Sequence, residues 1–135
     1  MTAIAPETTS FAALAENLGP ARDFLRRYVQ VSGWSGSDLD VVIAIGEVLQ
    51  NIVRHGFSGG SEAGTITMTL ALNEEMLIVT IDDTAPPTIP SEWSSNGRES
   101  YEGGLGLGII ERIASDVTFQ PTPTGNRATL HFAPE

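Results

Sequence analysis

Hydrophobic and polar positions along the chain form two kinds of pattern, one typical of helices and one typical of strands. Apolar residues recur every three or four positions in two segments, which predicts amphipathic helices over 21–31 and 38–55. They alternate with polar residues in two later segments, which predicts an antiparallel strand pair over 65–72 and 76–82. Shorter signals indicate an opening strand over 8–14, a third helix over 106–114, and closing strands over 117–121 and 127–132.

Helix-end signals frame the first two helices. Asn17 is a candidate N-cap for the first helix, and Pro20 lies where a first helical turn accepts proline. Ser37 or Asp38 is the corresponding cap of the second helix, and Gly56 is its predicted end.

The predicted elements follow the order β-α-α-β-β-loop-α-β-β, with neither an internal repeat nor a domain boundary. This order is typical of an α+β fold, so we expect a two-layer α/β sandwich in which helices cover one face of a mainly antiparallel sheet. The chain has 135 residues, of which 41% are hydrophobic, enough to build one core. We therefore predict a single domain over residues 1–135.

The charged residues and the missing residue types exclude several classes of function. The chain carries 17 acidic and 7 basic residues for a net charge of −10, and every basic residue is an arginine. The absence of lysine excludes a P-loop lysine and a Schiff-base nucleophile, and the absence of cysteine excludes a disulfide framework and a thiol nucleophile. So acidic a chain lacks the positive charge that nucleic-acid binding needs, and we expect no direct contact with nucleic acid.

Hydropathy points to a protein of the cytoplasm. No apolar run approaches the roughly 20 residues that a membrane-spanning helix needs. The N-terminal residues lack the basic flank and the apolar stretch of a signal peptide. We therefore expect a cytoplasmic protein that makes no membrane contact.

Three polar residues follow one another at four-residue spacing on the predicted second helix: Glu47, Asn51 and His55. Successive helical positions turn by about 100°, so these side chains share one stripe beside the apolar arc. A carboxylate and an amide one turn apart can hold a hydrated metal ion or orient a hydroxyl group. The alternative is a solvated helix edge, with His55 near the negative end of the helix dipole. Asn51 argues against that alternative, because asparagine is a poor helix former.

Two adjacent carboxylates, Asp82 and Asp83, lie at the end of the second alternating strand. Alternation directs Asp83 to the same inward face as Ile81, and Asp82 to the outer face. An inward carboxylate at the rim of a core needs a partner, because burying an unpaired charge is costly. The two residues can bind a metal ion or accept hydrogen bonds from a ligand, or they can simply mark a turn.

A glycine-rich run, Gly103-Gly104-Leu105-Gly106-Leu107-Gly108, leads directly into the predicted third helix. Glycine lets backbone amides approach a ligand, and a helix N-terminus attracts anions, so the run can hold phosphate without cationic side chains. Its spacing fits neither the dinucleotide-binding fingerprint nor the P-loop, and the alternative is a flexible connector. The long polar segment before it, 84–103, is typical of a mobile lid over a ligand.

Taken in order, these segments resemble the ATP-binding boxes of the GHKL (histidine-kinase-like, Bergerat-fold) ATPases, and most closely the bacterial anti-sigma factor serine/threonine kinases. Residues 47–56, EVLQNIVRHG, match the family's E-x-x-x-N-x-x-x-H helix. Residues 83–87, DTAPP, match its aspartate box, in which members often carry D-x-G-x-G, so both glycines are replaced here. The glycine run 104–108 and the closing segment 126–130 complete the set, and the resemblance covers nearly the whole chain.

The resemblance implies a role for each matching residue. Asn51 would hold the Mg²⁺ that bridges the phosphates of ATP. Asp83 would accept a hydrogen bond from the adenine amino group, with Asp82 as a competitor for that role. Glu47 would be the general base that takes the proton from a substrate hydroxyl, whereas His55 has no catalytic role. The remaining nucleotide contacts would be Ala85, Gly104, Leu105, Gly106, Leu107 and Gly108.

The activity implied is that of a serine/threonine-protein kinase acting as an anti-sigma factor. Such a protein phosphorylates an anti-sigma factor antagonist and sequesters a sigma factor, and members of the family commonly form homodimers. The alternative within the same resemblance is a non-catalytic ATP-binding module that switches protein partners. A third alternative is an α+β domain that binds no nucleotide and carries its glycines by coincidence.

Overall fold

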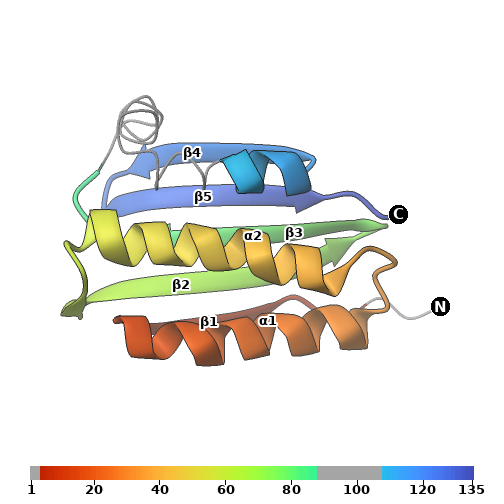
Figure 1. Cartoon of the computed structure of the whole chain (residues 1–135), viewed down its shortest axis with the longest axis horizontal. Coiled ribbons are helices and arrows are strands. Elements are labelled where there is room, and N and C mark those ends of the chain that lie inside the picture. The colour runs from red at the N-terminus through yellow and green to blue at the C-terminus, as the bar shows by residue number, and fades with distance from the viewer. Residues whose placement is uncertain (1–3, 88–107) are drawn as a thin grey trace.

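The computed structural model describes residues 4–87 and 108–135, and Figure 1 shows their arrangement. Helical segments are α1 (Leu18–Ser32) and α2 (Asp38–Asn51), a 3₁₀ turn over Ala15–Asn17, a π-helical turn over Ile52–Gly56, and a short helix over 108–113. The strands are β1 (Glu7–Ala13), β2 (Ser61–Asn73), β3 (Met76–Asp83), β4 (Asp116–Thr122) and β5 (Gly125–Phe132).

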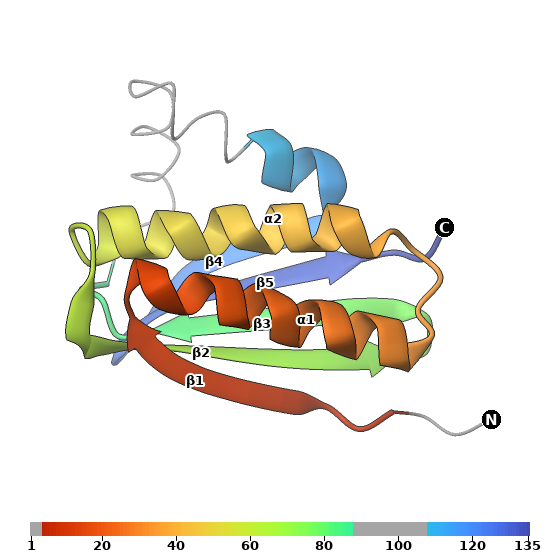
Figure 2. The same cartoon turned by 60° about the horizontal axis from the view of Figure 1, so that its bottom comes forward.

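The strands form one five-stranded sheet in the order β1-β2-β3-β5-β4, and every neighbouring pair is antiparallel. The helices lie together on one face of this sheet, as the turned view of Figure 2 shows. The predicted α+β two-layer sandwich is therefore confirmed.

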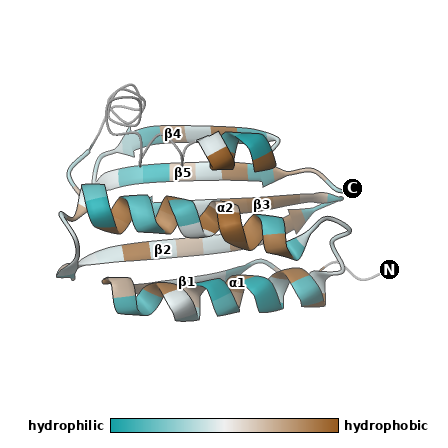
Figure 3. Ribbon diagram, viewed as in Figure 1, coloured by the Kyte–Doolittle hydropathy of each residue, from teal (hydrophilic) through white to brown (hydrophobic). Residues whose placement is uncertain are grey.

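The hydrophobic core fills the space between the helix layer and the sheet. Both layers contribute fully buried side chains, among them Leu25 of α1, Ile45 of α2 and Ile81 of β3. Removing each such side chain from water contributes about 1.5–3 kcal/mol to stability. In Figure 3 the hydrophobic colour is strongest along α2 and β3, where the two layers meet.

The first helix begins earlier than its hydrophobic pattern indicates, at Leu18. Asn17 occupies the position before it, as predicted, but its side chain does not cap the helix. The Asn17 Nδ2 group instead donates to the Ala12 carbonyl oxygen at 2.9 Å. At the second helix the cap is Ser37, whose hydroxyl accepts from the Asp40 amide.

The prediction of a regular α-helix up to His55 is wrong beyond Asn51. Regular hydrogen bonding ends at Asn51, and a π-helical turn continues to Gly56. In that turn the Phe57 amide donates to the Ile52 carbonyl five residues back. The wider turn breaks the predicted stripe, because a spacing of four no longer corresponds to one turn beyond Asn51.

The second strand also departs from its prediction, beginning at Ser61 rather than at residue 65. The segment before residue 65 contains glycine and serine and therefore looks like a turn. Pairing with β1 overrides this composition, since Ala13 lies opposite Ser61 across a β-bulge. Tertiary pairing thus extends the strand beyond its apolar alternation.

Two further features complete the fold. The predicted third helix is present over 108–113, while its predicted first residues, 106 and 107, lie outside the described residues. Among the helices of residues 4–87 and 108–135, none has the length and apolar character needed to cross a membrane.

Candidate functional site

The candidate site lies where the C-terminal end of α2 meets the ends of β3 and β5. In the described part of the chain, two polar side chains are buried, Asn51 at 4% exposure and Asp83 at 6%. Both belong to this region, and a narrow cavity there is lined by Ile52, Asp83, Phe119 and Asn126, among others. Burying polar groups in an apolar core costs free energy, so the position of these two residues makes this end of the sheet a candidate for function.

Asp83 is the last residue of β3 and points to the inner face, as strand alternation predicts. Its Oδ1 atom accepts two hydrogen bonds, from the Ala85 amide at 2.9 Å and from Asn126 Nδ2 at 3.0 Å. No described residue donates to the other oxygen, Oδ2. The carboxylate is thus held on one side and keeps an acceptor available on the other.

Burial is the main influence on the charge state of Asp83 and raises the pKa of this carboxyl above its usual range. The hydrogen bonds from Asn126 and Ala85 act in the opposite direction, and the neighbouring Asp82 raises the pKa further. The Asn126 amide and the Ala85 N–H are therefore what favours the ionised form, which accepts hydrogen bonds without donating any.

Asn126, near the start of β5, is the contact that sequence reasoning missed. Its Nδ2 group lies within hydrogen-bond distance of three oxygens: Asp83 Oδ1, the Ala85 carbonyl at 3.4 Å and the Pro86 carbonyl at 3.2 Å. The register places Asn126 directly opposite Asp83 on the neighbouring strand. A correct register between β3 and β5 would have revealed the pair, because residues opposite each other on one sheet face lie close together.

The turn after Asp83 packs tightly against two backbone segments. A Cβ atom at Gly125 would lie 2.8 Å from the Asp83 carbonyl carbon and 2.9 Å from Thr84 Cα, so the backbones touch without room for a side chain. On the other side, a Cβ at Gly56 would lie 3.1 Å from the buried Ala85 Cβ. The end of the π-helical turn and the start of β5 therefore enclose the Asp83 turn.

Asn51 lies on α2 one turn after Glu47, as predicted. It is buried, and none of the described residues forms a hydrogen bond with its side chain. Glu47 is half-buried. His55 lies in the π-helical turn and is exposed.

The glycine run is described only at its end. Gly108 begins the described part of the short helix, and no atom lies within 4 Å of where its Cβ would be. The other predicted phosphate-binding residues, Gly104, Leu105, Gly106 and Leu107, lie outside the described residues, as do positions 88–103 of the predicted lid.

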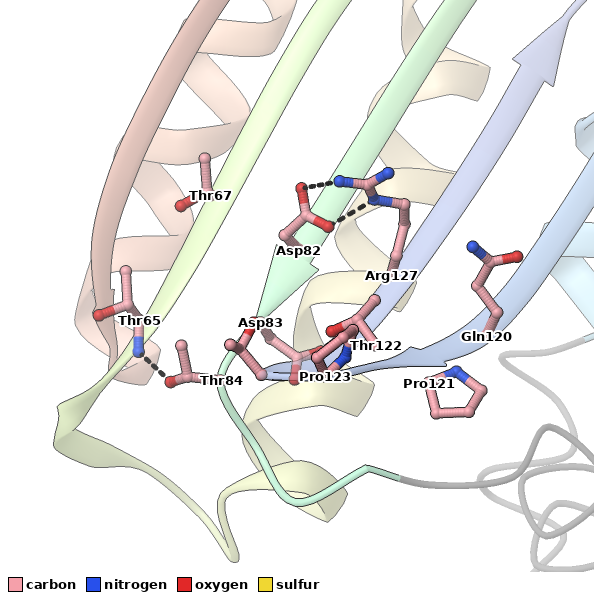
Figure 4. A pocket seen from close by; sticks show the side chains of 11 residues that line it. Thr65, Thr67, Asp82, Asp83, Thr84, Gln120, Pro121, Thr122, Pro123 and Arg127 are labelled. Atoms are coloured by element: carbon pink, nitrogen blue, oxygen red, sulfur yellow. Dashed lines mark hydrogen bonds and ion pairs between the residues drawn. The ribbon is translucent and has the colours of Figure 1, made fainter.

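The outer face of the same sheet end differs from the inner face. It carries a depression of about 590 Å³, shown in Figure 4, whose walls include Thr65, Thr67, Thr84 and Gln120. Asp82 points into this side and pairs with Arg127, at 2.6 Å between Asp82 Oδ1 and Arg127 Nε. This depression is roomier than the inner cavity, and its outward-facing charged residues, Asp82 and Arg127, satisfy each other. Asp83 also lines the depression, but its carboxylate is directed inward, toward Asn126. We therefore place the candidate site on the inner face.

The inner face at this end of the sheet is suited to a ligand that donates a hydrogen bond at one end and carries charge at the other. Asp83 Oδ2 is suited to an amino group, and the buried Asn51 amide offers an oxygen to a cation or a nitrogen to an anion. Within residues 4–87 and 108–135, no three His, Asp or Glu side chains come together as a metal site. A divalent cation bound by Asn51 would therefore take its other ligands from water and from a bound molecule.

Comparisons with known proteins agree with this architecture. The sequence matches the family described as the histidine kinase-like ATPase domain over residues 11–132. It is 28% identical over 116 residues to serine-protein kinase RsbW of Staphylococcus epidermidis, covering 78% of this chain and 73% of that protein. It is 34% identical over 87 residues to RsbW of Listeria innocua serovar 6a, covering 58% of this chain and 55% of that protein.

Solved structures support the same fold. The nucleotide-free catalytic domain of histidine kinase ThkA superimposes with a TM-score of 0.62, covering 96% of this chain and 99% of that chain. At 15% identity, this similarity concerns the fold alone.

Proposed function

The chain belongs to the family of histidine kinase-like ATPase domains, and from this premise we propose that it binds ATP with Mg²⁺ and acts as a serine/threonine-protein kinase. Its protein substrate would be an anti-sigma factor antagonist, and the same chain would sequester a sigma factor. The relatives named serine-protein kinase RsbW support the choice of a protein hydroxyl as acceptor.

The observation that carries the nucleotide half of this proposal is the half-satisfied Asp83 carboxylate. A buried carboxylate with one open oxygen is costly unless a ligand completes its hydrogen bonding. Asp83 Oδ2 would accept a hydrogen bond from the adenine amino group, while Ala85 and Asn126 hold Oδ1. Guanine presents a carbonyl oxygen at the equivalent position, so the same geometry would disfavour GTP.

Asn51 would serve the phosphate end of the nucleotide. Its buried side chain lacks a partner among the described residues, and its amide oxygen is a suitable ligand for Mg²⁺. When bound, the ion would neutralise phosphate charge and orient the phosphates for transfer. This arrangement would supply positive charge that a chain of net charge −10 lacks at this site.

Glu47 would act as the general base. Half-buried one helical turn before Asn51, it would accept the proton from the substrate serine or threonine hydroxyl. The hydroxyl oxygen then forms its bond to the γ-phosphorus as the bond from that phosphorus to the β-phosphate oxygen breaks. The alternative, a partner-switching module without catalysis, requires ATP binding but no base at position 47.

Replacing Glu47 by glutamine separates these two functions. We expect Glu47→Gln to reduce phosphate transfer to a purified antagonist by about 10²–10⁴-fold, because the amide cannot take up the proton. ATP affinity should change little, since the side chain keeps its size. Transfer is measured with labelled ATP and Mg²⁺, using candidate antagonists from the same genome.

Glu75→Gln is the matched control, since Glu75 is exposed in the turn between β2 and β3. It should transfer phosphate at the wild-type rate. If the wild-type chain binds ATP but transfers phosphate to no antagonist, the kinase proposal is wrong and the non-catalytic alternative takes its place.

A further inference from the structure

Two neighbouring strands hold the turn over residues 83–86 within the described part of the chain. On the β2 side, Thr84 exchanges two hydrogen bonds with the Thr65 backbone. On the β5 side, the contact comes from the Asn126 side chain. Asn126 Nδ2 reaches the Asp83 carboxylate and the carbonyl oxygens of Ala85 and Pro86, at 3.0, 3.4 and 3.2 Å. One amide group thus contacts both the functional carboxylate and the backbone that follows it.

The composition of the turn explains why it needs an external donor. Pro86 and Pro87 have no backbone N–H, so the turn cannot stabilise itself there with its own amides. None of the described residues 84–87 has a positive φ angle, so the turn does not need the conformations that favour glycine. The remaining internal bond to the carboxylate comes from the Ala85 amide at 2.9 Å.

We propose that Asn126 is a positioning residue that orients the Asp83 carboxylate, with Oδ1 held inside the turn and Oδ2 presented to the ligand. This inference rests on the proposed nucleotide function, in which Oδ2 recognises the adenine amino group. Asn126 does not need to touch the nucleotide itself, because its effect passes through Asp83 and the backbone of the turn.

Asparagine at position 126 suits this role better than aspartate or threonine would. The Gly125 backbone lies directly against the Asp83 backbone, which fixes the distance from position 126 to the carboxylate. Aspartate at position 126 could not donate and would place a like charge beside Asp83. Threonine could donate one hydrogen bond to Oδ1, but its single O–H could not serve the two carbonyls as well.

The test compares Asn126→Ala and Asn126→Thr with the wild type in titrations of ATP with Mg²⁺ across a pH series. We expect Asn126→Ala to weaken ATP binding roughly tenfold, as loss of a hydrogen bond to a charged group would. Asn126→Thr should restore part of the affinity. Thr129→Ala is the control, because Thr129 lies on the same strand but faces outward, and it should bind as the wild type does.

The pH profile distinguishes positioning from general destabilisation. Among the described residues, the charged groups beside Asp83 are Asp82 on β3 and Arg127 on β5, which pair with each other on the outer face. The hydrogen bond from Asn126 lowers the Asp83 pKa, so its removal should raise that pKa. Because the ionised carboxylate is the acceptor, the pH below which ATP affinity falls should be higher in Asn126→Ala.

A readout without nucleotide separates this inference from the proposed function. Hydrogen exchange of the Ala85 amide, which bonds to Asp83 Oδ1, should be faster in Asn126→Ala than in the wild type or in Thr129→Ala. Unchanged Ala85 exchange together with an unchanged pH profile would overturn the inference. If the wild type binds no ATP, the proposed function fails, and the Ala85 exchange alone decides the positioning role.

Discussion

Two neighbouring aspartates at the end of β3 occupy opposite faces of the sheet and have opposite surroundings. Asp82 faces outward, its side chain 35% exposed, and pairs with Arg127, which is 48% exposed. Asp83 faces inward and is 6% exposed; described residues donate to its Oδ1 atom and none of them donates to Oδ2. The outward carboxylate is thus paired with an arginine, whereas the inward one has an oxygen that receives no hydrogen bond from the described residues.

This difference distinguishes an exposed ion pair from a buried carboxylate that we propose as a recognition site. An exposed pair gains little and needs no ligand, because water solvates whatever the partner does not. A largely buried carboxylate draws less on water, so an oxygen to which no described residue donates is suited to a hydrogen bond from a ligand. Exposure and hydrogen bonding therefore favour Asp83 over Asp82 as the proposed adenine contact.

The largest expected effect is on ATP affinity, when each of the two carboxylates is replaced in turn by an amide. Asp83→Asn should weaken ATP binding by about 100-fold or more, because an amide that keeps its oxygen toward Asn126 must present its NH₂ group to the adenine amino group. Asp82→Asn should change the affinity by less than about twofold. Titration calorimetry of both variants at one salt concentration measures the contrast, and equal losses would remove the distinction between the faces.

A second prediction concerns the backbone contact behind the site. Gly125→Ala should destabilise the fold by about 2 kcal/mol, because its Cβ would meet the Asp83 and Thr84 backbone and force the strands apart. Gly19→Ala in α1 is the control: no atom lies within 4 Å of its Cβ position, and alanine favours helix. Urea denaturation should show a lower midpoint for the first variant and an equal or higher one for the second.

The smallest effect is expected on the outer face. Arg127→Ala should cost at most about 1 kcal/mol of stability, since the pair it breaks with Asp82 is partly exposed. Raising the salt concentration should shrink the difference from the wild type, because salt screens exposed charges. A loss that is larger, or insensitive to salt, would show that the outer face contributes more than a surface ion pair.

Hydrophobic periodicity sufficed to predict the sheet, the layer arrangement and the inward direction of Asp83. All three depend on repeating patterns in which many residues agree. The π-helical turn after Asn51 could not be predicted in this way, because residues 52–56 continue the apolar pattern of the helix and that pattern does not reveal the hydrogen-bond spacing.

Asn126 was missed for a related reason. Its importance depends on the β3–β5 register, in which it lies opposite Asp83, and those residues are 43 positions apart in the sequence. The closing strand was predicted to begin at residue 127, which left Asn126 in a turn. A one-residue error at a strand end thus concealed a contact in the candidate site.

Titration of the full chain with ATP in the presence of Mg²⁺ measures whether the inner face at this end of the sheet binds the nucleotide. We predict saturable binding at one site per chain, with GTP binding more weakly under the same conditions. If no binding is seen at millimolar ATP, the nucleotide function is wrong, and the alternative of an α+β domain that binds no nucleotide takes its place.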